Sequence, residues 1–117
     1  MSATVAFRVS AGIGFLAVAL GAIGGHALRD LLIERDFTAT WQTASFYHIV
    51  HAIMLCVVAG RAPFVKGAWW AFLIGVLLFS GSLYALCLSN LRMLGALTPF
   101  GGVSLLVGWA WLVFAKK

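Results

Sequence analysis

The stretch AWWAFLIGVLLFSGSLYALCL, residues 68–88, contains no charged residue. At about 1.5 Å of rise per residue, an α-helix of this length reaches across the roughly 30 Å hydrocarbon core of a bilayer. Lipid offers the backbone no hydrogen bonds, so a spanning segment must satisfy its own N–H and C=O groups. We therefore interpret residues 68–88 as a transmembrane helix.

Three further segments share this character, namely residues 5–28, 41–59 and 94–114. Hydrophobic residues make up 63% of the 117 and charged residues 9%, against roughly 45–50% and 25% in soluble domains. The second and third connections are too short for anything but antiparallel neighbours. The sequence thus predicts a single domain over residues 1–117, an all-α integral membrane antiparallel four-helix bundle.

The first segment resembles a signal peptide in part, because Arg8 precedes an apolar run that ends in small residues. That run exceeds the roughly 7–15 residues of a signal peptide's apolar core, so we expect it to be a retained span. The connection after it, residues 27–37, places leucines and Phe37 at helical spacing beside charges. We expect this connection to extend the first helix or to lie along the interface.

The eight basic residues report how the chain crosses the membrane. They are spread over connections and tails without forming a basic face, so we do not expect nucleic acid as a partner. Alternating spans put Arg8, Arg61, Lys66, Lys116 and Lys117 on one side, and Arg29, Arg35 and Arg92 on the other. Cytoplasmic connections are enriched in Lys and Arg, so both termini are expected in the cytoplasm.

Aromatic and turn residues mark the expected helix ends. We interpret the tryptophans as belts at the two membrane interfaces: Trp41 on the outer side, and Trp69, Trp70, Trp109 and Trp111 on the inner side. Thr98 and Pro99 are expected to cap the fourth helix and move its start a few residues past Leu94.

Small residues at helical spacing predict packing surfaces, because lipid tails supply no hydrophobic reason for apolar helices to associate. They are Ala17, Gly21 and Gly25 in the first span, Gly81 and Ala85 in the third, and Gly101 and Gly108 in the fourth. Such surfaces serve packing within one chain, or association into a homo-oligomer or a larger membrane complex. The spacing fits both uses.

Two histidines interrupt the second span, in the stretch SFYHIVHAIML, residues 45–55. His48 and His51 are spaced i,i+3, and counting inward from Trp41 puts them roughly 10 and 15 Å deep. The same count places other polar side chains in this outer half, whereas the inner half is mostly apolar. The predicted cluster comprises His26, Tyr47, His48, His51, Ser80, Tyr84, Thr98 and Ser104. An unpaired polar group in hydrocarbon costs about 2–7 kcal/mol, so these groups are expected to satisfy one another.

Four roles fit such a cluster. It can be a hydrogen-bond network that sets helix register, at about 0.6 kcal/mol per bond. It can hold the polar head of a lipid, a quinone or another amphipathic molecule. His48 and His51, with His26 as a third ligand, are candidates for a metal or haem site. The histidines could also serve a proton-coupled channel or transporter.

Catalysis has little support in the sequence. No carboxylate lies within a span, and no Ser-His-acid or Cys-His arrangement falls at one depth. We therefore expect a protein that is not an enzyme and has no resident cofactor. The leading interpretation is a structural or accessory membrane component whose cluster holds a lipid-like ligand. A histidine-ligated metal or haem protein is the alternative, and a proton-coupled transporter the third.

Four blocks of the sequence resemble one family: GAIGGHALR at 21–29, FYHIVHA at 46–52, LLFSGSLYAL at 77–86, and LTPFGG at 97–102 followed by GW at 108–109. They are similar to the signature blocks of uncharacterised protein family 0382, or domain of unknown function 423, with a eukaryotic relative called transmembrane protein 256. The resemblance implies a four-helix, multi-pass protein of the bacterial inner membrane and supplies no activity or cofactor. Its recurrent positions here are His26, Tyr47, His48, His51, Ser80, Gly81, Ser82, Tyr84, Thr98, Pro99, Gly101 and Gly102.

Overall fold

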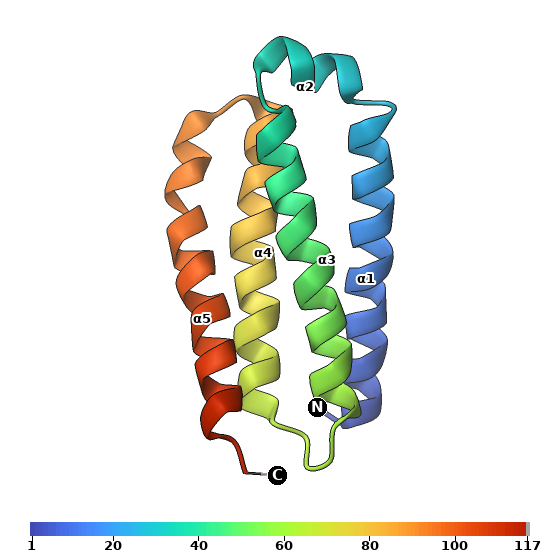
Figure 1. The fold of residues 1–117 in the computed structure, drawn as a ribbon, viewed down its shortest axis with the longest axis vertical. Helices are drawn as coiled ribbons and strands as arrows, with labels where there is room; N and C mark the ends of the chain where they lie inside the picture. The colour runs from blue at the N-terminus through green and yellow to red at the C-terminus, as the bar shows by residue number, and fades with distance from the viewer. Residues whose placement is uncertain (117) are drawn as a thin grey trace.

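The computed structural model describes residues 1–116 and consists of helices joined by short connections (Figure 1). The elements are α1 (Ala3–Gly25), α2 (Arg29–Arg35), α3 (Thr38–Gly60), α4 (Lys66–Ser89), the 3-10 helix η1 (Arg92–Ala96) and α5 (Thr98–Phe114). Within this part of the chain, four segments are long and apolar enough to cross a membrane. The all-α class is confirmed, and each of the four predicted spans corresponds to one of these segments, with ends that differ by a few residues.

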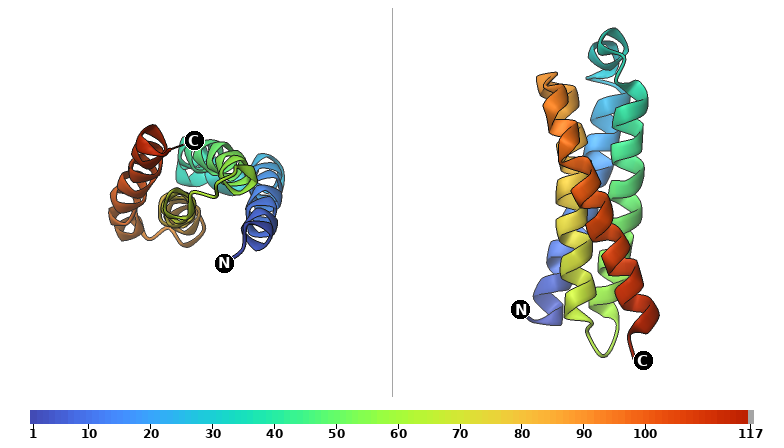
Figure 2. Two further views of the ribbon diagram at one scale, coloured as in Figure 1. Left: turned by 90° about the horizontal axis from the view of Figure 1, so that it is seen from below. Right: turned by 90° about the vertical axis from the view of Figure 1, so that its left-hand side faces the viewer.

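The four long helices run antiparallel, and α1 begins at the end of the bundle where α5 finishes (Figure 1). Helices α3 and α4 form the central pair, with α1 packed on α3 and α5 packed on α4 (Figure 2). The outer helices therefore expose apolar side chains, among them Phe15 at 74% and Phe114 at 84%. Such faces suit a lipid environment, in which an exposed apolar side chain carries no penalty.

The first connection forms a separate helix, α2, which crosses one end of the bundle (Figure 1). It is anchored by Leu32 and by Phe37 just beyond it, which are 2% and 5% exposed. Arg35 Nη1 donates to the carbonyl oxygens of Cys87 and Leu88, at 2.8 and 2.9 Å. These carbonyls end α4 and lack partners within their own helix. The connection therefore does not extend α1; it forms a separate helix across the end of the bundle.

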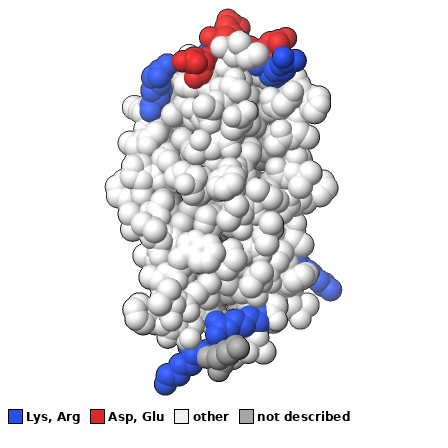
Figure 3. All heavy atoms as spheres, viewed as in Figure 1, with Lys and Arg blue, Asp and Glu red and all other residues white. Residues whose placement is uncertain are grey.

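Charged side chains lie at the two ends of the bundle, with an uncharged band between them (Figure 3). One end carries Arg8, Arg61, Lys66 and Lys116, whereas Lys117 lies outside the described residues. The other end carries all three acids and three arginines: Asp30, Glu34, Asp36, Arg29, Arg35 and Arg92. Charges at both ends of an apolar band are typical of a protein that spans a bilayer.

Two of the five tryptophans are core residues, which corrects the predicted belts. Trp41 is 3% exposed and Trp69 is fully buried. Trp70, Trp109 and Trp111 are 40–49% exposed. Successive helical residues point about 100° apart, so Trp69 and Trp70 face different surroundings. Counting depth along the helix does not give that direction.

Helix α5 begins where the sequence predicts, but Thr98 does not cap it. The helix begins at Thr98, with Pro99 in its first turn and η1 before it. No side chain caps this end. Thr98 Oγ1 instead lies 2.7 Å from Ser82 Oγ and joins α5 to α4.

Candidate functional site

His48 joins three helices through both of its ring nitrogens. It lies on α3 and is 4% exposed. Its Nε2 is 2.9 Å from the carbonyl oxygen of Ile13 on α1, and its Nδ1 is 2.9 Å from the Tyr84 hydroxyl on α4. Because a carbonyl can only accept, Nε2 carries the hydrogen and Nδ1 accepts from Tyr84. The Tyr84 oxygen also lies 3.4 Å from Ser45 Oγ.

His51 lies one turn further along α3 and faces α5 instead. Its Nδ1 is 2.8 Å from the carbonyl oxygen of Tyr47, so Nδ1 carries the hydrogen. Its Nε2 accepts a hydrogen bond of 3.0 Å from Trp109 Nε1–H on α5. The two imidazoles are thus held as opposite neutral tautomers. Residues at i and i+3 differ by about 60° around a helix, enough to meet different neighbours here.

The other predicted polar side chains form separate bonds. Ser80 donates to the carbonyl oxygen of Ala44, and Ser104 donates to that of Ala71, both at 2.7 Å. His26 is exposed at the end of α1, where its Nδ1 lies 2.8 Å from the carbonyl oxygen of Ala22. The structure brings His48 into contact with Tyr84 and stacks the Tyr47 and His51 rings, with 6.1 Å between their centres, but it distributes the remaining residues over different helix pairs. Backbone carbonyls, which sequence reasoning did not consider, are the commonest acceptors.

Two further polar contacts were missed from the sequence. Trp69 Nε1–H donates to Ser10 Oγ at 2.9 Å, joining α4 to α1 near the end where the chain begins. Trp41 Nε1–H donates to the carbonyl oxygen of Leu20 at 3.0 Å. The inner half, expected to be mostly apolar, thus contains one buried polar pair, between Trp69 and Ser10. A buried indole N–H usually finds a partner, which is the signal that could have identified both.

This network leaves little for a ligand to bind. In residues 1–116 no buried side-chain nitrogen or oxygen lacks a hydrogen-bond partner. The same residues contain no group of three or more His, Cys, Asp or Glu placed to hold a metal ion. Ligation by either nitrogen of His48, or by Nε2 of His51, would require breaking a bond that already joins two helices. The arrangement holds helices in register.

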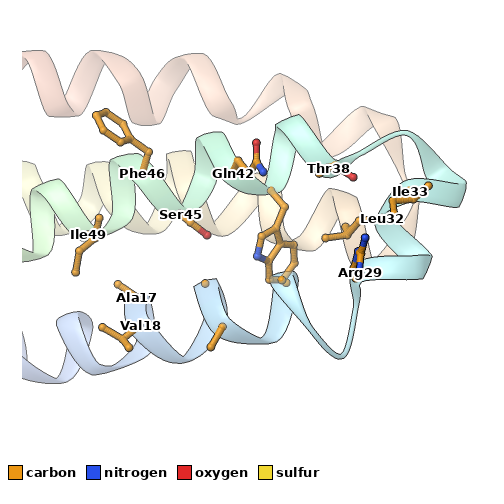
Figure 4. A pocket seen from close by; sticks show the side chains of 15 residues that line it. Ala17, Val18, Arg29, Leu32, Ile33, Thr38, Gln42, Ser45, Phe46 and Ile49 are labelled. Carbon is orange, nitrogen blue, oxygen red and sulfur yellow. The ribbon is translucent and has the colours of Figure 1, made fainter.

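A groove of about 800 Å³ runs between α1 and α3 and ends beneath α2 (Figure 4). Its α1 side is built from small residues, Ala17, Gly21, Ala22, Gly24 and Gly25. Val18, Phe46 and Ile49 add larger apolar side chains away from α2, and Arg29, Thr38 and Gln42 lie near the α2 end. The charged and amide side chains of the lining therefore lie at the α2 end, beside Leu32 and Ile33.

The glycines of α1 have two roles: one allows close packing of α3, and others line the groove. A Cβ atom on Gly24 would overlap the indole of Trp41, so this glycine lets α3 approach. A Cβ on Gly21 or Gly25 would meet nothing within 4 Å. These two residues, predicted as a packing surface within one chain or between chains, meet no other helix of this chain and line the groove.

Of the other residues predicted to form packing surfaces, some contact a neighbouring helix and others do not. A Cβ on Gly101 would overlap the Phe79 backbone, and one on Gly108 the Phe72 ring, so both glycines allow α5 to approach α4. Ala17 is buried, whereas Ala85 is exposed and Gly81 meets nothing within 4 Å. Gly67 and Gly75 accommodate Trp111 and Leu105 and were missed.

A second groove of about 460 Å³ lies along α3, α4 and α5 and is lined by Tyr47, His51, Phe79 and Trp109 among others. The Tyr47 ring is 39% exposed and packs 4.7 Å, centre to centre, from Phe79. Its hydroxyl makes no hydrogen bond to any residue in the described chain. Apart from Tyr47 and the ring edges of His51 and Trp109, the lining is apolar.

Comparison with known proteins gives one family and several relatives. A family described as "Protein of unknown function (DUF423)" matches residues 20–102. The UPF0382 membrane protein YwdK of Bacillus subtilis is 41% identical over 86% of this chain and 85% of its own length. A UPF0382 membrane protein of Schizosaccharomyces pombe is 38% identical, covering 89% and 94%. The UPF0382 inner membrane protein YgdD of Escherichia coli is 40% identical, covering 83% and 77%. No solved structure matches the chain.

Proposed function

Because the chain belongs to the DUF423 family, whose relatives are named membrane proteins, we propose that it is a non-enzymatic accessory component of the membrane. In this role it holds one lipid-like molecule in the groove between α1 and α3. The site differs from the predicted cluster of histidines and hydroxyls. The buried members of that cluster, among them His48, His51 and Ser80, have their hydrogen-bond partners within the protein, whereas the groove is open to the surroundings of the protein.

The height of the groove is the observation that carries this proposal. On α3 its lining runs from Thr38 to Ile49, which is about 17 Å at 1.5 Å per residue. That is roughly half of a 30 Å hydrocarbon core, the depth of one leaflet. A lipid tail fits this depth. A partner's spanning helix would be longer, and α2 crosses the end of the groove, where Leu32 and Ile33 line it (Figure 4).

The order of side chains along the groove also suits an amphipathic molecule. Ligand sites are mostly apolar with a few polar groups that fix orientation. Here the apolar part faces the middle of the bundle and the polar part lies near the charged end. A tail in the bilayer already lies in hydrocarbon, so the groove retains it through shape and through contacts to its head.

The hydrogen-bond network supports the groove by holding its two walls. The bond from Trp41 to Leu20 joins α3 to α1 within the groove, and the bond from His48 to Ile13 joins them just below it. Both bonds set the separation of the two helices. A fixed width is what allows a site to select one shape of occupant.

The charges support an orientation for the site. The end with Arg8, Arg61, Lys66 and Lys116 carries no acid among the described residues. We assign this end to the cytoplasm, by the excess of Lys and Arg in cytoplasmic connections. The groove then opens to the outer leaflet of a bacterial inner membrane.

Native mass spectrometry of the protein purified in mild detergent tests the proposal. We expect one retained lipid per chain. Gly21→Leu adds a side chain to the wall of the groove, at a position where a Cβ meets nothing within 4 Å, and should reduce the retained lipid about tenfold. Gly12→Leu is the matched control, since it lies on α1 outside the groove and its Cβ also meets nothing within 4 Å. Equal retention by all three proteins, or a wild type without lipid, contradicts the proposal.

A further inference from the structure

The groove carries a positive charge at its α2 end, and from this we infer that its occupant is a phospholipid with a net negative headgroup, whose phosphate Arg29 binds. The inference rests on the proposed function and names the chemistry of the ligand. Three features support it. One face of α2 presents Arg29 to the groove, the donors at that end are free, and inside a bilayer the acyl tails give the groove no basis for choosing between lipids.

Of the charged residues of helix α2, only Arg29 lines the groove. Arg29, Leu32 and Ile33 line the groove, and their i, i+3 and i+4 spacing puts them on one helical face. Asp30 follows Arg29 and Glu34 follows Ile33, so each acid points about 100° around the helix from a residue that lines the groove. Neither acid lines the groove itself. The polar end of the groove therefore contains a guanidinium without a carboxylate.

That guanidinium is not used elsewhere in the fold. Arg29 is exposed, and its side chain makes no hydrogen bond or ion pair with any residue of 1–116. The two other arginines at this end are engaged: Arg35 binds the carbonyls that end α4, and Arg92 lies 5.2 Å from the ring centre of Phe37. Arg29 is thus free to bind a ligand.

Two neutral polar groups lie at the same end of the groove. Thr38 and Gln42 line it, both are exposed, and the side chains of neither form a hydrogen bond within the described chain. Their hydroxyl and amide can bond to the oxygens of a phosphate or a glycerol. Together with Arg29 they give the groove donors and one positive charge.

Electrostatics then favours an anionic lipid over a zwitterionic one. Every lipid tail already lies in hydrocarbon, so tails of equal length give the groove no basis for choice. A guanidinium binds phosphate oxygens through paired hydrogen bonds. A choline head brings its own cation close to Arg29, whereas a glycerol head does not. One arginine near a membrane surface contributes about 1 kcal/mol, which is roughly a fivefold preference.

A competition experiment tests the inference. The full-length protein is equilibrated in detergent with equal amounts of phosphatidylglycerol and phosphatidylcholine that carry identical acyl chains, and bound lipid is counted by native mass spectrometry. We expect the wild type to favour phosphatidylglycerol about fivefold. Arg29→Gln should bind the two lipids about equally, and Arg29→Lys should keep part of the preference because it keeps the charge.

Arg92→Gln is the matched control, since it removes a cation at the same end but outside the groove, and it should keep the fivefold preference. A wild type that binds both lipids equally, or an Arg29→Gln protein that still prefers phosphatidylglycerol, overturns the inference and leaves the proposed function standing. A wild type without lipid overturns both. A dimer that forms in place of lipid binding, and that Gly21→Leu abolishes, identifies a second copy as the occupant and overturns both.

Discussion

The Tyr84 hydroxyl shows how single residues hold this bundle together. It donates to His48 Nδ1 on one side and lies within reach of Ser45 on the other. Since His48 is buried and its other nitrogen bonds to α1, the phenol completes a link between α1, α3 and α4. Interhelical bonds in membranes are individually weak, so the fold depends on several of them.

Removal of this hydroxyl should destabilise the protein without changing its shape. Tyr84→Phe leaves His48 Nδ1 without its donor, and we expect the free energy of unfolding to fall by about 1–2 kcal/mol. Tyr47→Phe is the matched control, because the Tyr47 hydroxyl has no hydrogen bond within the described chain. It should stay within about 0.5 kcal/mol of wild type. Titration with a denaturing detergent measures both, and an equal loss in the two variants would contradict the assignment.

At the scale of helices, the close approach of α4 and α5 depends on where glycine stands. Gly101 lies against the backbone of Phe79, so no side chain fits between the two helices there. Its neighbour Gly102 has room, since a Cβ at that position would come no closer than 3.8 Å to the Phe79 ring. Adjacent glycines of one helix thus have different roles.

Substitution by alanine should separate these two roles. Gly101→Ala forces α4 and α5 apart and should cost about 1–3 kcal/mol, as overpacking generally does. Gly102→Ala makes an ordinary contact and favours the helix, so we expect no loss of stability. Thermal unfolding in detergent compares them. The account of α4–α5 packing is wrong if Gly101→Ala is as stable as Gly102→Ala.

The four spans could be predicted because length and hydrophobicity alone determine them. The sequence did not allow us to predict which neighbouring helix each helix face contacts, and this limited the prediction of the site. His48 and His51 were placed in one patch because they share a broad face, yet about 60° of rotation gives them different partners. The spacing of Gly21 and Gly25 indicated a smooth surface correctly, but not that it stays unfilled.

The groove was also beyond prediction, because three elements form it together. It needs the small residues of α1, the bonds that hold α3 at its distance, and the turn that lays α2 across the end. Only the small residues can be identified in the sequence; the bonds and the placement of α2 depend on the tertiary structure. Arg29 was accordingly counted as a marker of topology and not as a residue of a site.

At the scale of the whole molecule, two charged ends enclose an apolar band (Figure 3). We expect the end at which α1 begins and α5 finishes to face the cytoplasm, by five basic residues against three. A green fluorescent protein fused to the C-terminus should fluoresce, and alkaline phosphatase fused there should be inactive. An active phosphatase fusion would reverse the orientation and move the groove to the cytoplasmic leaflet.

The most direct test of the account is to locate the lipid on the protein. Phosphatidylglycerol with a photoactivatable group in its acyl chain is incorporated into vesicles with the wild type, irradiated, and the labelled peptides are mapped. The account predicts labelling concentrated on residues 17–25 and 45–49, the walls of the groove, and loss of that labelling in Gly21→Leu but not in Gly12→Leu. Labelling spread evenly over the exposed faces of α1 and α5, or concentrated beside Tyr47 and Trp109, would contradict it.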